Sequence, residues 1–197
     1  MFKVGITGGI GSGKTWVCRV FQQLGVPLFE ADTEVKKLYN TDAGLKAELI
    51  RNFGQTSYDE NGVFNTSYFR VLLSDESKRG LLNGMVHPRI FQRFEAWSLE
   101  QSAPYVIKEA AILFESGADK TVHKTIGVFA PLEMRINRVM ERDSREREAV
   151  LNIIDMQMSD DDLRNRVDYT ISNDNESSVI KQVRDLHQIL INESRHF

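Results

Sequence analysis

The 197-residue sequence contains a single cysteine and no apolar run that approaches the length of a membrane-spanning helix. Cys18 cannot form a disulfide within the chain, and no basic-then-apolar leader precedes the first apolar residues, so we expect a cytoplasmic protein without a membrane anchor. Positive charge is not in excess either, because the net charge is −3, and this argues against bulk binding of nucleic acid. Internal repeats and low-complexity tracts are also missing. The remaining composition, 41% hydrophobic and 27% charged, is that of an ordinary globular domain.

A glycine-rich segment follows the first apolar run directly. Residues 8–15, GGIGSGKT, fit the pattern G-x-x-x-x-G-K-[ST], after the apolar run 2–7 and before a helical pattern. Glycines allow successive backbone N–H groups to surround phosphate oxygens, and the helix start adds its positive end. Lys14 is expected to reach the β- and γ-phosphates, and the Thr15 hydroxyl is expected to bind Mg²⁺. The sequence therefore predicts a nucleoside triphosphate site in the loop that holds Gly9, Gly11, Ser12, Gly13, Lys14 and Thr15.

The rest of the chain alternates between short apolar runs and helical patterns. Strands are expected at residues 2–7, 26–29, 105–107, 125–129 and 169–171, with a closing helix at 179–190. Strands separated by helices predict an α/β fold, here a five-stranded parallel sheet of the P-loop kinase type with helices on both faces. Between residues 66 and 101 we expect a helical stretch that breaks near His87, with Pro88 starting a new helix.

Asp32 comes just after the second expected strand. Because ligands bind beyond the carboxyl ends of parallel strands, its carboxylate is expected near the phosphate site. It could accept a proton from an attacking hydroxyl or help to hold Mg²⁺ through water. A helix N-cap is an equally good interpretation, because Asp is common before a helical pattern.

A long helical insertion separates the second and third strands. Residues 43–102 are rich in aromatic side chains, most of which belong to a core, but the segment is longer than a crossover between strands needs. We therefore interpret it as an acceptor-binding insertion. Within it, His87 is either a hydrogen-bonding partner of the substrate or a structural histidine satisfied by nearby backbone.

Five arginines cluster in residues 135–157. One interpretation is a solvated helix with i,i+4 ion pairs, and the other is a mobile lid whose arginines close over the triphosphate. We favour the lid, because a chain of net negative charge must supply local cations to a phosphate site. Ser144 is expected to be the N-cap of a second helix and thus the hinge of this lid. The arginines are Arg135, Arg138, Arg142, Arg145 and Arg147.

An ordered set of motifs resembles the dephospho-CoA kinase family over nearly the whole chain. The phosphate loop alone is shared by many ATPases and kinases, whereas the ordered set with these spacings is much more specific. The matching pieces are residues 4–15, Ala31-Asp32, His87-Pro88, residues 112–117 (ILFESG), residues 138–143 (RVMERD), Gln157 and residues 168–173 (DYTISN).

This resemblance implies ATP-dependent phosphorylation of the ribose 3′-hydroxyl of dephospho-CoA, which gives CoA and ADP. It implies that residues 9–16 bind ATP, with Trp16 contributing its backbone N–H, and that Asp32 is the general base. It also implies Arg138 and Arg142 as lid arginines, Asn173 near the adenine, and His87 and Glu115 at the substrate. It also implies Mg²⁺ as cofactor and one P-loop kinase domain over 1–197. In that domain the core comprises about 1–42, 103–134 and 158–197, the insertion about 43–102, and the lid about 135–157. We expect a monomer or weak homo-oligomer with only small-molecule partners.

The chain departs from the family pattern at a few positions. Trp16 replaces a small hydroxyl residue, which matters little if only its backbone N–H is used. Glu30 replaces an Asp and Glu109 begins a segment that lacks the usual proline, so the roles of these two carboxylates stay open.

Two other classes of protein share the phosphate loop. A GTPase-type switch fits only through the D-x-x-G at residues 59–62, which lies in a polar turn, and the chain has no [NT]-K-x-D motif. A related kinase for another small acceptor, such as a nucleoside monophosphate, would share the loop, insertion and lid and differ only in what it phosphorylates.

Overall fold

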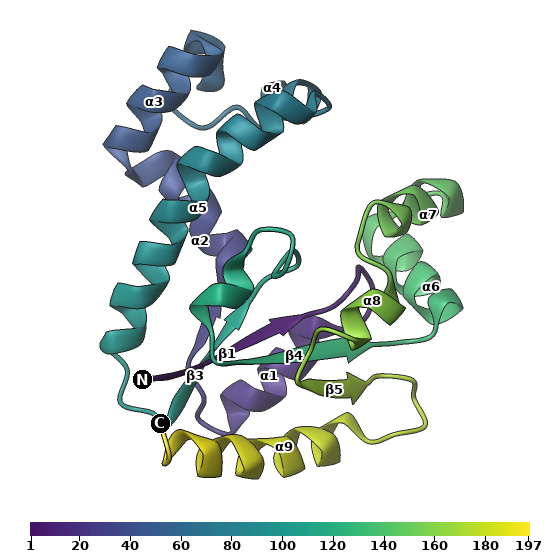
Figure 1. Ribbon diagram of the computed structural model, residues 1–197. Helices are drawn as coiled ribbons and strands as arrows, with labels where there is room; N and C mark the ends of the chain where they lie inside the picture. Colours follow the sequence, from purple (N-terminus) through teal and green to yellow (C-terminus); the bar gives the residue numbers. More distant parts are fainter. The chain divides into compact units, whose positions relative to one another are not determined.

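Five parallel strands form one sheet in the computed structural model, which describes residues 1–197 (Figure 1). The strands lie in the order β2-β3-β1-β4-β5. All four pairings are parallel, which confirms the predicted sheet. Their bounds are β1 Phe2–Thr7, β2 Leu28–Glu30, β3 Tyr105–Glu109, β4 Lys124–Phe129 and β5 Tyr169–Ser172.

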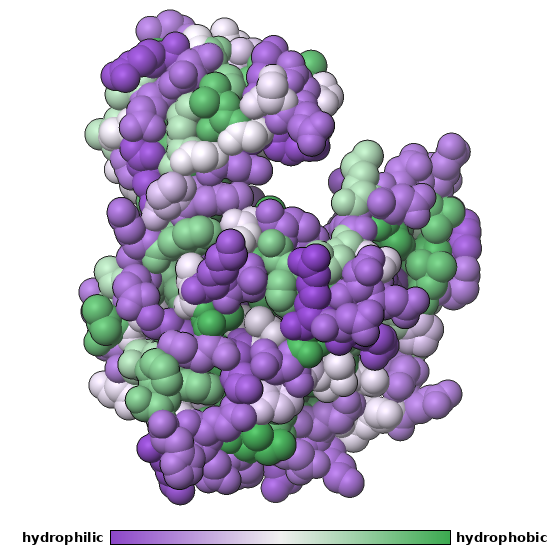
Figure 2. Space-filling view, in the orientation of Figure 1, coloured by the Kyte–Doolittle hydropathy of each residue, from purple (hydrophilic) through white to green (hydrophobic).

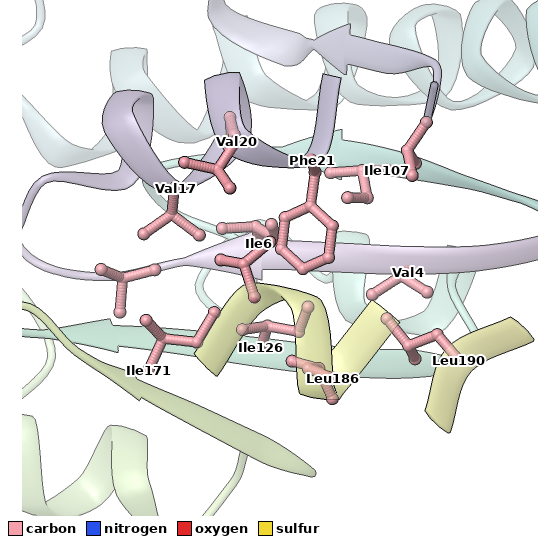
Figure 3. Close-up of a cluster of buried hydrophobic side chains, with 14 of the residues drawn as sticks. Val4, Ile6, Val17, Val20, Phe21, Ile107, Ile126, Ile171, Leu186 and Leu190 are labelled. Atoms are coloured by element: carbon pink, nitrogen blue, oxygen red, sulfur yellow. The ribbon is translucent and has the colours of Figure 1, made fainter. Parts of the chain in front are cut away.

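Helices α1 (Lys14–Gln23) and α9 (Val179–Ser194) cover one face of the sheet (Figure 1). Alternate residues of β1 point toward these helices, so Val4 and Ile6 are fully buried against Phe21 of α1 and Leu190 of α9 (Figure 3). This alternation follows from the two-residue period of a strand. The largest apolar core therefore lies directly beneath the strand that leads into the glycine-rich segment.

The opposite face is covered by shorter elements. Leu113 and Val122 approach Gly5 so closely that a Cβ at this glycine would touch their side chains. The remaining elements of this part of the chain are η2 Ala118–Thr121, α6 Leu132–Asp143, α7 Arg147–Asp155 and α8 Asp160–Arg164. No helix of the structure is long and apolar enough to span a membrane, and hydrophilic side chains cover most of the visible face of the sheet-containing unit (Figure 2).

Residues Ala31–Ala96 form a compact unit distinct from the sheet-containing unit, which comprises Met1–Glu30 and Trp97–Phe197. Most of the predicted insertion falls in it. Aromatic side chains stack on one another within it: Phe64 lies on Tyr39 with ring centroids 3.9 Å apart and on Phe69 at 4.5 Å. Its elements are α2 Ala31–Thr41, α3 Ala43–Phe53, η1 Gln55–Ser57, α4 Thr66–Leu72 and α5 Glu76–Leu99, the last of which continues into the sheet-containing unit.

Two predicted helix ends are wrong. Helix α5 runs through Pro88 instead of starting there, because Gly84, whose carbonyl loses its amide partner, is exposed to water. The break lies earlier, where Asp75 accepts hydrogen bonds from the amides of Ser77 and Lys78. Ser144 is not an N-cap: it ends α6 in the left-handed conformation, with φ 51°, and Glu146 precedes α7.

Candidate phosphate site

The glycine-rich loop joins the carboxyl end of β1 to the first residue of α1. It bends through left-handed backbone at Gly11, with φ 77°, and at Gly13, with φ 93°. A Cβ at Gly11 would collide with the backbone of Arg135, and a Cβ at Gly13 with the side chain of Asn173. Both positions therefore require glycine for conformation and for space.

The loop has one unsatisfied polar group and one cation that suit a phosphate. The Ser12 hydroxyl is buried and has no hydrogen-bond partner in the protein. Lys14 Nζ donates to the Gly8 carbonyl at 2.6 Å, so its cation lies at the loop. An orphaned buried hydroxyl beside a cation and a helix N-terminus fits a bound anion. Thr15 and Trp16 are exposed in the first turn of α1.

Two predicted site residues secure the loop from the other side. The Asn173 side-chain amide donates to the Ser12 carbonyl at 2.9 Å. Arg138 of α6 donates to the carbonyls of Gly11 at 3.4 Å and Asn173 at 3.3 Å. Arg138 thus lies at the loop. Arg142, one turn further along α6, makes a bidentate pair with its neighbour Asp143 at 2.7 and 2.8 Å and has no contact with the loop.

Arg135 contacts the loop more closely than Arg138 does. Its side chain is 5% exposed, and it donates from Nε to the Ile10 carbonyl at 3.0 Å and from Nη1 to Asp160 at 2.8 Å. The Ile10 amide in turn donates to the side chain of Gln157 at 2.8 Å. Sequence reasoning grouped Arg135 with four exposed or partly exposed arginines and gave it no separate role. Its spacing of four residues from the buried Val139 is the signal that places it on the inner face of α6.

A small recess lies beside the loop in the sheet-containing unit. Its lining includes Gly8, Gly9, Glu115, Gln157 and Leu163. Glu115 is exposed in the segment after β3. The predicted substrate residue Glu115 and the predicted phosphate loop therefore share one recess.

Asp32 and His87 belong to the second compact unit. Asp32 is exposed and is the second residue of α2, within its first turn, so it is not the N-cap of that helix. His87 is half-buried on α5 and stacks on Phe91, with ring centroids 5.9 Å apart.

A parallel sheet with a glycine-rich loop between its central strand and the first helix defines a P-loop nucleotide-binding protein. Comparison with known proteins narrows this class. The family model of dephospho-CoA kinase matches residues 2–178. The chain is 36% identical to a dephospho-CoA kinase of Bacteroides fragilis over 185 residues, which cover 93% of this chain and 90% of that protein.

A second relative and a solved structure are similar to this chain over most of its length. A dephospho-CoA kinase of Salinibacter ruber is 38% identical over 178 residues, covering 88% of this chain and 89% of that protein. The solved structure of TT1252 from Thermus thermophilus has a TM-score of 0.81 and 30% identity, covering 97% of each chain. The chain belongs to the dephospho-CoA kinase family. It is a kinase of the final step of coenzyme A biosynthesis, which uses ATP as phosphoryl donor.

Proposed function

We propose that this chain transfers the γ-phosphoryl group of ATP to the ribose 3′-hydroxyl of dephospho-CoA through the residues of the phosphate loop, α2 and α6. The observation that carries the proposal is the loop itself, where an orphaned buried hydroxyl at Ser12, the cation of Lys14 and the amino end of α1 meet. Such a loop binds the β- and γ-phosphates of a nucleoside triphosphate.

In the proposed reaction the 3′-hydroxyl oxygen forms a bond to the γ-phosphorus while the bond to the β–γ bridging oxygen breaks. Asp32 accepts the hydroxyl proton, and ADP leaves with the electron pair of the broken bond. Lys14 and Arg138 stabilise the negative charge that spreads over the transferred group. Arg142 would contribute to this stabilisation only after its ion pair with Asp143 breaks, because its guanidinium donates to that carboxylate in the structure.

The Thr15 hydroxyl would hold Mg²⁺, which when bound neutralises charge on the phosphate oxygens. Thr15 fits this role because its side chain is exposed in the first turn of α1 and makes no hydrogen bond within the protein. Hydroxyl and phosphate oxygens are ligands that Mg²⁺ prefers.

We propose His87 and Glu115 as acceptor-binding residues, and Glu115 lines the recess beside the loop. We further propose that α6 and α7 act as a lid and that Asn173 lies near the adenine. We also propose a cytoplasmic location and a monomer or weak homo-oligomer.

The acceptor and Asp32 are tested together. Purified protein with ATP and Mg²⁺ is offered dephospho-CoA, AMP, dTMP and shikimate in separate reactions, with ADP release and the phosphorylated product both measured. We expect CoA from dephospho-CoA and no comparable turnover of the others. Asp32→Asn should lower kcat by about 10²–10⁴-fold, the usual contribution of a general base. It should leave ATP affinity nearly unchanged, and the exposed Asp185→Asn of α9 serves as control.

Turnover of another acceptor alone would refute the acceptor assignment. A kcat of Asp32→Asn within threefold of the wild-type value would remove Asp32 from the reaction.

A further inference from the structure

Ile10, at the bend of the phosphate loop, is held by three separate contacts. Its amide donates to Gln157 at 2.8 Å, and its carbonyl accepts from Arg135 at 3.0 Å. Its side chain packs against the apolar cluster of α6 and α7, which consists of Ile136, Val139 and Val150. Both backbone groups and the side chain of one loop residue are therefore bound to the segment 135–157, which we proposed to be the lid.

Arg135 is the central residue of this attachment. It lies in the first turn of α6 and is buried, and its guanidinium joins the Ile10 carbonyl to Asp160, the first residue of α8. A buried guanidinium with one carboxylate partner cannot be moved cheaply, because its charge must keep that partner. The forked geometry of arginine allows both bonds at once, which lysine cannot reproduce.

The two glycines that flank Ile10 also lie against Arg135. A Cβ at Gly9 would collide with the guanidinium of Arg135, and a Cβ at Gly11 with its backbone. The loop therefore lies flat against Arg135, with no side chain between them.

We propose that Arg135 is a positioning residue that couples the phosphate loop to the α6–α7 helix pair. Through its bond to Ile10 it fixes the loop in the conformation that receives the triphosphate. Through α6 it transmits phosphate binding to α7, which has no bond of its own to the loop backbone. This inference rests on the proposed role of the loop in binding ATP, and it does not depend on the acceptor.

The test compares Arg135→Gln with Arg184→Gln, the same change at an exposed position of α9 that lies outside the site. ATP affinity is measured by calorimetry, KM for ATP and for dephospho-CoA by product formation, and hydrogen exchange of residues 147–155 with and without ATP. In the wild type and in Arg184→Gln we expect ATP to slow exchange in α7. In Arg135→Gln we expect ATP binding to weaken about tenfold or more, the scale of one lost hydrogen bond to a charged group.

We further expect that Arg135→Gln leaves KM for dephospho-CoA within twofold and that saturating ATP no longer protects α7. Asp160→Asn provides a second variant if Arg135→Gln folds poorly, because it removes the carboxylate but keeps the bond from Arg135 to Ile10. It should weaken both ATP binding and the protection of α7 by ATP, each by a smaller factor than Arg135→Gln. The proposal would be overturned if ATP still protects α7 in both variants. It would also be overturned if the variants weaken the binding of ATP and of dephospho-CoA by the same factor. Wild-type protein that binds ATP and shows protection, yet makes no CoA, would refute only the proposed acceptor.

Discussion

Replacing Lys14 by Met separates the chemistry of the phosphate loop from its folding. Lys14 Nζ lies 2.6 Å from the Gly8 carbonyl, which is a charged hydrogen bond at a half-buried site. Its loss should lower the free energy of unfolding by about 1 kcal/mol, the net contribution of an ordinary hydrogen bond, because water reaches this position and weakens the effect of the charge. For a chain of this size, that corresponds to a decrease in Tm of about 2–4 °C.

The effect on turnover should be far larger. Lys14 is the only lysine of the loop, and removal of one well-placed cationic donor from a reacting group costs about 10²–10³ in kcat. Methionine keeps the length and the apolar stem, so the backbone cradle should stay in place. Product formation from ATP and dephospho-CoA is measured beside Tm, with Lys181→Met on the exposed surface of α9 as the matched control. A kcat of Lys14→Met within tenfold of the wild-type value would show that this cation does not face the transferred group.

Three further predictions concern the metal, the core and pH. Thr15→Ala should raise the Mg²⁺ concentration needed for half-maximal activity while Tm stays within about 1 °C, since an exposed hydroxyl contributes little to stability; an unchanged Mg²⁺ dependence contradicts the role as ligand. Phe21→Ala should lower the free energy of unfolding by about 3–5 kcal/mol in urea titrations, because Phe21 is 0% exposed in the largest core; a loss below 1 kcal/mol would mean that the core refills the cavity. Burial lowers the pKa of Lys108 from its ordinary 10.5 to about 8. Between pH 8 and 10.5 the unfolded chain therefore binds more protons than the folded chain, so this group makes the free energy of unfolding rise with pH. Between pH 7.5 and 9.5 the gain should be about 2 kcal/mol in the wild type and absent in Lys108→Met, and equal pH dependence of the two proteins would refute it.

The sheet was predictable because its strands carry their signal locally. The apolar run of β1 and the glycines after it indicated both the central strand and the phosphate loop, and the alternation of strands and helices indicated parallel order. Pro88 shows where local reasoning fails, since a proline interrupts a helix only if the freed carbonyl has no other partner. The exposure of Gly84, which decides this, depends on the packing of the whole helix.

The residues around the loop also fall into two groups: those that a local sequence pattern locates and those whose position depends on tertiary packing. Lys14 and Thr15 follow from a motif of fixed spacing, which is why the sequence alone located them. Arg135 and Arg142 look alike in sequence, yet one is buried against Ile10 and the other is paired with its neighbour Asp143. That difference arises from the packing of α6 against a loop more than a hundred residues earlier, which no local pattern contains.

The close contact between Gly9 and Arg135 restricts the order in which substitutions can accumulate in this chain. Gly9 has no left-handed backbone, so alanine is excluded there only by the end of the Arg135 side chain. A shorter residue at 135 would remove that obstacle, and the two changes should therefore be far from additive. At Gly11 the obstacle is the backbone of the same residue, which no replacement at 135 can remove. Gly9→Ala can therefore be accommodated once Arg135 has been replaced by a shorter residue, whereas no replacement at position 135 makes room for Gly11→Ala.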